Sequence, residues 1–466
     1  MDNSLIREKL PSFMFEDGSV FSGASAFYLV DSHKVFLRSP FGTGIITDKG
    51  IFEELKKKEV SSCFLRKLKS NGFVDGFRRF DVRCQKPMPR FFMVDFTTKC
   101  NMNCYYCLRH FPDSGENISY EQLDLILAYI VKYCKKYGIN SISVQPWGGE
   151  PLITADKIFY MQDCFTSNNI YADISVQTNG LLLTDDICKK LHERKIRVGV
   201  SIDGCEEIQN IHRKNLFDEN TYSVVKNNIG NLIKYYGRDF GTISVNSRFS
   251  LPYIEKSLDA FARELGIHSV KMNLMHPNCD EFDFESIISE DEIPEFIGRV
   301  LGKLISLNKE GYSLFDSNIR DKLLNLLQGG CRELCHSDGC TGGFTSVTFS
   351  REGDIYPCEL VGNTAVRLGN INDEEDLPHM ILSNLSRNVY FCERKNDDCG
   401  DCDWFVNCRG GCTASCLSYN RKTGEVDKKE CSINKYLYPE LIKLILTDSD
   451  AVRFLTNGEL VITEDI

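Results

Sequence analysis

The chain has 466 residues, of which 66 are acidic, 55 are basic and 21 are cysteines, and its net charge is −11. This acidic balance, with the basic residues dispersed, argues against a nucleic-acid partner. The N-terminus is polar and no long apolar segment follows, so we expect no signal peptide, no membrane partner and a cytoplasmic location. Because cytoplasmic thiols stay reduced, the cysteines are expected to bind metal or clusters rather than form disulfides.

Residues 1–88 are predicted to form a small α+β domain. The pattern indicates a β-hairpin followed by two helices, over residues 26–30, 34–37, 50–58 and 62–71. This layout resembles the winged-helix-like peptide-recognition domains that accompany maturases of ribosomally made peptides. The alternative is a packing extension without a binding role. Residues 80–90, which contain Pro87 and Pro89, are predicted to be a linker.

Residues 89–280 alternate between strand and helix patterns, which predicts parallel strands joined by right-handed crossovers. The six predicted strands are 91–96, 141–145, 174–177, 197–202, 243–249 and 270–275. The predicted helices are 120–137, behind a capping box of Ser119 and Gln122, then 155–165, one capped by Thr184, 222–236 and 254–265. Bridging helices at 293–308 and 318–327, within residues 281–330, should close the side of an incomplete barrel.

Three thiols, Cys100, Cys104 and Cys107, follow the first barrel strand directly. They therefore occupy the loop at its C-terminal end, where parallel α/β folds bind their ligands. Three thiolates can hold a cubane iron–sulfur cluster and leave its fourth iron without a protein ligand. A zinc site is the alternative, with His110 as the fourth ligand.

This spacing, with the aromatic Tyr106 before the third cysteine, resembles the radical S-adenosylmethionine (SAM) superfamily. The resemblance is strengthened by Gly148-Gly149-Glu150 after the second strand. It implies that the open iron binds SAM, that the two glycines admit the methionine end, and that the Glu150 carboxylate grips its ammonium group. Further polar residues at strand ends are implied to contact the ribose and carboxylate of SAM: Gln177, Thr178, Asn179, Ser201, Asp203 and, on the fifth strand, Arg248.

Cysteines are dense in residues 331–466, at positions 340, 358, 399, 402, 408, 412 and 431. This pattern resembles the SPASM domain, which implies two auxiliary four-iron clusters and three 4Fe-4S clusters in all. The first would be bound by Cys335, Cys340, Cys358 and Cys412, and the second by Cys399, Cys402, Cys408 and Cys431. Cys331 is an alternative to Cys335, and Cys392 and Cys416 are expected to be spare thiols.

The predicted fold class is therefore α/β: a partial (β/α)6 radical SAM barrel between the N-terminal α+β domain and the SPASM domain. The resemblance implies abstraction of a substrate hydrogen by a 5′-deoxyadenosyl radical, with electrons from a donor such as flavodoxin or ferredoxin. Glu359, next to a cluster cysteine, is implied to act as a catalytic base, shielded from water with a raised pKa.

We expect a thioether, a carbon–carbon crosslink or a related oxidation in a ribosomally made peptide, since a small substrate would not need an N-terminal domain. The alternatives are protein oxidation of the sulfatase-maturating type and a reaction on a small molecule.

Overall fold

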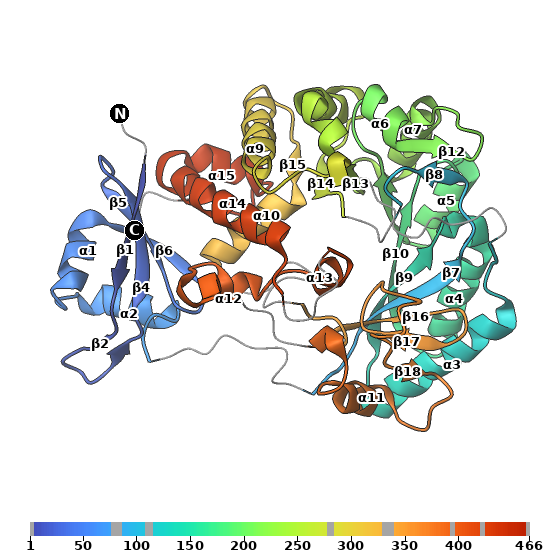
Figure 1. Ribbon diagram of the computed structural model, residues 1–466, viewed down its shortest axis with the longest axis horizontal. Coiled ribbons are helices and arrows are strands. Elements are labelled where there is room, and N and C mark those ends of the chain that lie inside the picture. Colours follow the sequence, from blue (N-terminus) through green and yellow to red (C-terminus); the bar gives the residue numbers. More distant parts are fainter. Residues whose placement is uncertain are drawn as a thin grey trace.

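The computed structural model describes residues 4–75, 86–107, 115–276, 284–328, 340–391, 397–419 and 425–462 (Figure 1). It contains a small N-terminal sheet and a large sheet that runs through the barrel and into the C-terminal region. None of the helices in these residues is long and apolar enough to cross a membrane.

The N-terminal domain is built on a four-stranded antiparallel sheet. Its strands, in spatial order, are β1 (Leu5–Leu10), β4 (Ala24–Leu29), β5 (Lys34–Arg38) and β6 (Gly44–Asp48). The helices α1 (Lys49–Lys56) and α2 (Ser62–Ser70) follow, and a short hairpin of β2 (Phe13–Met14) and β3 (Val20–Phe21) stands apart. The predicted hairpin and both predicted helices are confirmed, whereas β1 and β6 were not predicted.

Both faces of this small sheet are buried. Side chains alternate across a strand, so Val35 and Leu37 of β5 join a core with Phe52 of α1. On the opposite face, Phe27 and Phe36 belong to the main core of the molecule. The N-terminal sheet is therefore packed between the helices of its own domain and the C-terminal region, where Figure 1 shows α12 (Phe405–Cys408) and α14 (Lys428–Thr447) beside it.

The large sheet contains the six predicted strands, all parallel as predicted, and neighbours in the sheet follow one another in the sequence. They are β7 (Phe91–Thr97), β9 (Ser141–Gly148), β10 (Tyr171–Thr178), β11 (Arg197–Ser201), β13 (Gly241–Asn246) and β14 (Ser269–Leu274). A short seventh strand, β15 (Phe315–Asp316), is added parallel to β14. The sheet does not close on itself, so the barrel is partial, as expected.

Helices cover the outside of this sheet. They are α3 (Tyr120–Tyr137), α4 (Ala155–Ser167), α5 (Asp185–Glu193), α6 (Glu206–His212), α7 (Tyr222–Tyr236) and α8 (Ile254–Asp259). The predicted capping box of α3 is present: the Ser119 hydroxyl accepts a hydrogen bond from the Gln122 N–H, and the Gln122 side chain accepts one from the Ser119 N–H. The short α6 was not predicted, because seven residues carry too little periodicity to stand out.

The C-terminal region extends the large sheet at its other edge. Strand β16 (Ser346–Phe349) pairs in parallel with β7, and β17 (Asp354–Tyr356) and β18 (Gly369–Asn370) continue antiparallel. The described part of the predicted linker contacts this C-terminal extension, because the Met88 N–H donates a hydrogen bond to the Phe344 carbonyl (3.1 Å). The sequence predicted neither this pairing nor a shared sheet.

Further helices surround the junction of the barrel and the C-terminal region. They are α9 (Ile293–Lys309), α10 (Ser317–Leu327), α11 (Leu377–Asn384), α12 (Phe405–Cys408), α13 (Thr413–Tyr419), α14 (Lys428–Thr447) and α15 (Ser449–Leu455). The first two confirm the predicted bridging helices. The core they share with the barrel is continuous, and it includes residues from β7, α9, α14 and α15.

Candidate functional site

The first three thiols lie in the loop after β7, as predicted. The loop is fixed by a short antiparallel pair between β8 (Met102–Cys104) and β12 (Arg213–Asn215). Burial raises the pKa of Cys100 to about 11 and that of Cys104 to about 12. The negative charges of Cys100 and Cys107 further raise the pKa of Cys104, so the three thiols lie within electrostatic reach of one another.

The environment of these thiols is better suited to binding a cluster than to nucleophilic catalysis. Buried thiols with raised pKa values are poor nucleophiles, whereas a coordinating metal deprotonates them. Among the described residues, no three His, Cys, Asp or Glu side chains converge to hold a single metal ion. A cubane makes a different demand, because each thiolate binds a different iron. His110, the predicted zinc ligand, lies outside the described residues.

Gly148 and Gly149 form a cradle against the cysteine loop. Gly148 has φ +132°, and a Cβ there would lie 2.1 Å from the Thr97 carbonyl oxygen. A Cβ on Gly149 would lie 2.1 Å from the Lys99 carbonyl oxygen and 3.2 Å from the Cys100 Cβ. The strand-end loop therefore approaches the cysteine loop backbone to backbone, which only glycine permits.

Glu150 follows this cradle and is 1% exposed. Its Oε1 accepts hydrogen bonds from the Leu152 N–H (3.0 Å) and the Thr178 hydroxyl (2.8 Å). Its Oε2 accepts from the Asn179 N–H (2.7 Å). Burial outweighs these bonds and raises the pKa of Glu150 to about 7. A carboxylate has about four acceptor sites, so one is left for a ligand cation.

The polar residues at the ends of β10 and β11 are brought together around this loop. The Asn179 side-chain amide donates to Asn101 Oδ1 (2.7 Å) and lies 3.8 Å from the Cys100 Sγ. Gln177 Nε2 donates to the Ser201 hydroxyl (2.9 Å). The predicted residues thus line one edge of the sheet beside the cysteines, and their contact with SAM stays a prediction.

Asp203 is the centre of a buried network rather than a free ligand group. Its Oδ2 accepts from the Tyr106 hydroxyl (2.6 Å) and Arg213 Nε (3.1 Å) and lies 3.2 Å from His212 Nδ1. His212 Nε2 is 2.8 Å from the Ser247 hydroxyl. Burial alone would raise the pKa of Asp203, but Arg213, His212 and Tyr106 outweigh it and lower the pKa to about 2.

The Ser–His–Asp order of this network is that of a hydrolase triad, but here it is structural. Ser247 and His212 are 0% exposed, so no substrate reaches the hydroxyl. Arg213 also extends to the cluster loop, with Nη1 3.9 Å from the Cys104 Sγ and its guanidinium 5.2 Å from the Tyr106 ring centre. The network therefore fixes the cysteine loop to the barrel.

Sequence reasoning missed His212 and Arg213. His212 is the last residue of helix α6, and Arg213 is the first residue of strand β12. Neither element was predicted, so neither residue belonged to a recognised motif. An adjacent His and Arg, nine and ten residues after a strand-end Asp, were the only available signal.

Arg248 is placed differently from the prediction. Strand β13 ends at Asn246, and Arg248 begins a 3-10 helix, Arg248–Tyr253. Its guanidinium donates to Glu292 Oε2 (2.9 and 3.1 Å) and to the Glu285 carbonyl (2.8 Å). The prediction of a strand position was wrong because Ser247 caps the new helix and ends the extended run.

The C-terminal thiols gather in two groups. Burial raises the pKa of Cys412 well above its usual value, and the charges of Cys340 and Cys358 add to the effect. The Tyr390 hydroxyl lies 2.8 Å from the Cys340 Sγ. These three thiols match the first predicted auxiliary set, and Cys331 and Cys335 lie outside the described residues.

The second group also follows the prediction. Burial raises the pKa of Cys431, and the charges of Cys402 and Cys399 raise it further. Burial likewise raises the pKa of Cys408 to about 12, with a contribution from Cys431. Cys431 of α14 therefore lies within electrostatic reach of the other three thiols of the predicted set, Cys399, Cys402 and Cys408.

Of the two thiols expected to be spare, Cys416 is 2% exposed, and its Sγ lies 3.9 Å from the Gly410 carbonyl oxygen. Cys392 lies outside the described residues.

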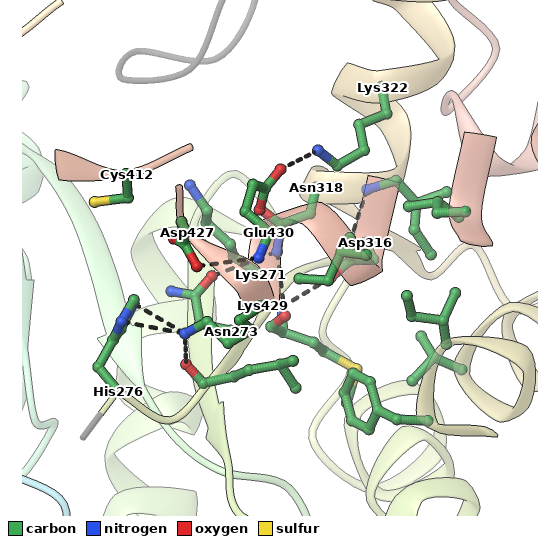
Figure 2. A pocket seen from close by; sticks show the side chains of 18 of the residues that line it. Lys271, Asn273, His276, Asp316, Asn318, Lys322, Cys412, Asp427, Lys429 and Glu430 are labelled. Carbon is green, nitrogen blue, oxygen red and sulfur yellow. Dashed lines mark hydrogen bonds and ion pairs between the residues drawn. The ribbon is translucent and has the colours of Figure 1, made fainter. Parts of the chain in front are cut away.

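A cavity of about 320 Å³ lies between β14, α9, α10 and α14 (Figure 2). Lysines enter it from three elements. Lys322 donates to Glu430 (2.8 Å), and the buried Lys429 donates to the Leu274 carbonyl (3.4 Å) and lies 3.1 Å from His276 Nδ1. Burial lowers the pKa of Lys429. This cavity was not predicted from the sequence.

Glu359 and Cys412 also line this cavity. Glu359 therefore lies beside the first auxiliary thiols, as predicted from its place after Cys358. Its side chain is exposed, so the expected shielding from water was wrong: it stands in a bend after β17 rather than inside the core.

Comparisons with known proteins agree with this geometry. Residues 94–247 match the model of the radical SAM superfamily, and residues 340–403 match that of the SPASM iron–sulfur cluster-binding domain. The cysteine-type anaerobic sulfatase-maturating enzyme of Clostridium perfringens (strain 13 / Type A) is 26% identical over 328 residues, which cover 67% of this chain and 85% of the enzyme.

Solved structures share the fold. Native anSMEcpe with bound AdoMet has a TM-score of 0.66 at 21% identity, and the match covers 76% of this chain and 99% of that one. Native anSMEcpe with bound AdoMet and the Cp18Cys peptide has a TM-score of 0.63 at 22% identity and covers 77% and 99%. The chain therefore contains a radical SAM domain followed by a SPASM domain, which together imply SAM and more than one 4Fe-4S cluster as its cofactors.

Proposed function

We propose that this enzyme installs an oxidative crosslink, a thioether or a carbon–carbon bond, in a ribosomally made peptide. The observation that carries the proposal is the N-terminal sheet. About a quarter of this chain has no counterpart in anSMEcpe, although almost all of that protein is matched. The N-terminal domain lies outside both matched family models, which cover residues 94–247 and 340–403, and its edge strand is suited to hold a peptide.

Strand β1 is the reason for this view of the domain. It pairs with β4 on one side, and among the described residues no backbone group bonds to its other side. An extended leader peptide can add to such an edge, with backbone bonds supplying affinity and alternate side chains supplying specificity. Residues 1–88 would then be the leader-binding domain, 89–280 the catalytic barrel and 331–466 the auxiliary-cluster domain.

The chemistry of crosslinking assigns a role to each part of the site. Cys100, Cys104 and Cys107 would hold the cluster that binds SAM, and this pair would supply a 5′-deoxyadenosyl radical as the acceptor of one substrate hydrogen atom. Glu359 at the cavity wall is the proposed base for the proton that the substrate must also lose. The auxiliary clusters held by the C-terminal cysteines would supply the acceptor for one electron, so that the loss of two hydrogen atoms balances the one new bond.

The sheet edge at β10 and β11 would hold SAM, with Glu150 taking its ammonium group and Gln177, Asn179 and Ser201 its polar groups. The buried network of Asp203 keeps the cysteine loop in place during turnover. A flavodoxin or ferredoxin would return electrons, and we place the enzyme in the cytoplasm without a nucleic-acid or membrane partner.

The second candidate is oxidation of a protein side chain to an aldehyde. The names of the relatives favour it, since they are sulfatase-maturating enzymes and one was solved with a peptide. The two candidates share the barrel and the cluster thiols. They differ in whether the N-terminal domain has a leader to bind.

The experiment uses the full chain, reconstituted without oxygen, and a peptide encoded beside its gene. Crosslinking predicts a product lighter by two hydrogen atoms that does not react with a hydrazide. A hydrazide-reactive product would replace this proposal with the aldehyde alternative, and absence of any peptide product would favour a small-molecule substrate.

Leader binding is tested with the same peptide carrying one N-methyl amide at a time. Strand addition predicts that every second position in the leader weakens binding, because alternate amides point at the sheet edge. N-methylation of residues outside the leader serves as the control. Equal tolerance at all leader positions would contradict docking on β1.

A further inference from the structure

We propose that the N-terminal sheet holds the loop of the second auxiliary cluster, and that this cluster assembles fully only when the sheet is docked. Arg38 is the positioning residue for this role. The inference rests on Cys399, Cys402, Cys408 and Cys431 as the ligand set. It does not depend on which substrate the enzyme modifies.

Ionic contacts join the sheet to the segment between Cys402 and Cys408. Arg7 of β1 pairs with Asp403 (Nε–Oδ2 2.5 Å), whose side chain is 11% exposed. The Ser25 hydroxyl of β4 donates to the same carboxylate (2.5 Å). Lys9 of β1 pairs with Asp401, just before Cys402.

Arg38 of β5 makes the deepest contact and is 2% exposed. Its Nε donates to the Asp403 carbonyl oxygen (3.0 Å), and Nη2 donates to Asn407 Oδ1. The guanidinium also lies 4.9 Å from the Trp404 ring centre. One side chain of the N-terminal domain therefore contacts three of the five residues between two cluster cysteines.

An aromatic stack closes the same interface. The Trp404 ring lies between Phe27 of β4 (5.6 Å) and Tyr438 of α14 (4.8 Å), and both pairs are stacked. Trp404 directly precedes α12, a helix of four residues. So short a helix has little stability of its own, so its position and that of Cys408 depend on this packing.

The consequence follows from how a cluster binds. Its four thiolates must be within reach together, and three of them lie in or beside the segment that the sheet grips, at positions 399, 402 and 408. Releasing that segment separates the thiols before the metal can hold them. A sheet whose only task was to capture a leader would have no need of a buried arginine at this place.

The test is the iron content and electron paramagnetic resonance (EPR) spectrum of full-length Arg38→Met after anaerobic reconstitution. We expect the loss of about four irons per chain, matching Cys402→Ala, while the EPR change on adding SAM is kept. Arg38→Lys should recover part of the iron. The matched control is Arg66→Met, an exposed arginine on α2 of the same domain.

Wild-type iron and an unchanged spectrum in Arg38→Met would overturn the proposal. So would full iron in Cys402→Ala, because the ligand set would then be wrong. If Arg38→Met does not fold, the surface variant Arg7→Gln with Asp403→Asn tests the same interface, with partial loss of the same iron as the supporting result and full iron as the opposing one.

Discussion

Replacing Glu150 with glutamine should weaken SAM binding without changing the stability of the unliganded protein. The rise of the Glu150 pKa from 4.5 to about 7 corresponds to about 3 kcal/mol against the ionised carboxyl in the unliganded protein. Glutamine removes that burden. The carboxylate of Glu150 accepts hydrogen bonds from two backbone N–H groups, those of Leu152 (3.0 Å) and Asn179 (2.7 Å). The amide of glutamine would face one of these N–H groups with its own NH₂ donor, and the loss of that hydrogen bond costs about 1–3 kcal/mol of folding free energy.

The two effects oppose each other, so the stability of unliganded Glu150→Gln should stay close to that of the wild type. The affinity for SAM, in contrast, should fall. The variant lacks the charge for the ligand ammonium, and a charge-assisted bond is worth about 1.5–3 kcal/mol, or about 10- to 150-fold in affinity.

The assay is equilibrium dialysis of SAM against reconstituted enzyme, beside thermal unfolding of the unliganded protein. Thr178→Val is the control, since it removes the 2.8 Å bond to Glu150 but keeps the charge. Against the sequence-based expectation, we do not count Thr178 as a SAM contact, because its hydroxyl is buried, donates to Glu150 and accepts from the Gly180 N–H (3.1 Å). It should lower stability by about 1 kcal/mol and leave SAM affinity within about threefold. SAM affinity in Glu150→Gln equal to that of the wild type would refute the assignment of this carboxylate to the ligand.

Three further substitutions probe the site and its surroundings. Gly149→Ala should abolish SAM cleavage but keep the auxiliary-cluster iron, because its Cβ would lie 2.1 Å from the Lys99 carbonyl; normal cleavage would show that the loops are not in contact. Asp203→Asn should lower the unfolding free energy by about 3–5 kcal/mol in denaturant titrations, since it leaves Arg213 buried without its carboxylate; a loss below about 1 kcal/mol would contradict this. Burial raises the pKa of Asp316 to about 6, so the folded state resists its ionisation, and stability should fall by about 3 kcal/mol as the pH rises from about 4 through 6. Asp316→Asn should lose this pH dependence, and an unchanged slope would assign it to other groups.

Motifs and periodicity predicted the barrel well, because the strands carry rows of buried apolar side chains and helix α3 carries a local signal in its Ser119 cap. The cysteine groups were also predicted, since ligand spacing is a local property. What could not be predicted depends on contacts between distant segments. The pairing of β16 with β7 and the grip of Arg38 on Asp403 have no periodic signature in the chain.

The site shows the same division. Gly149 and Glu150 belong to a contiguous motif and could be found directly. His212 and Arg213 lie in short elements whose meaning appears only when Asp203 and Tyr106 are placed beside them. Arg248 was misplaced because the strand ends at Asn246, three residues before the predicted end at 249, where the Ser247 cap begins a 3-10 helix.

The parallel pairing of β7 with β16 also constrains how the protein is made. Phe91 pairs with Ser346, so the sheet cannot be completed until most of the chain has left the ribosome. Until then β7 is an unpaired edge with a buried apolar sequence, and such edges promote aggregation. A nascent chain of this kind is prone to aggregate, and truncated products that end before residue 346 should be insoluble rather than partly active.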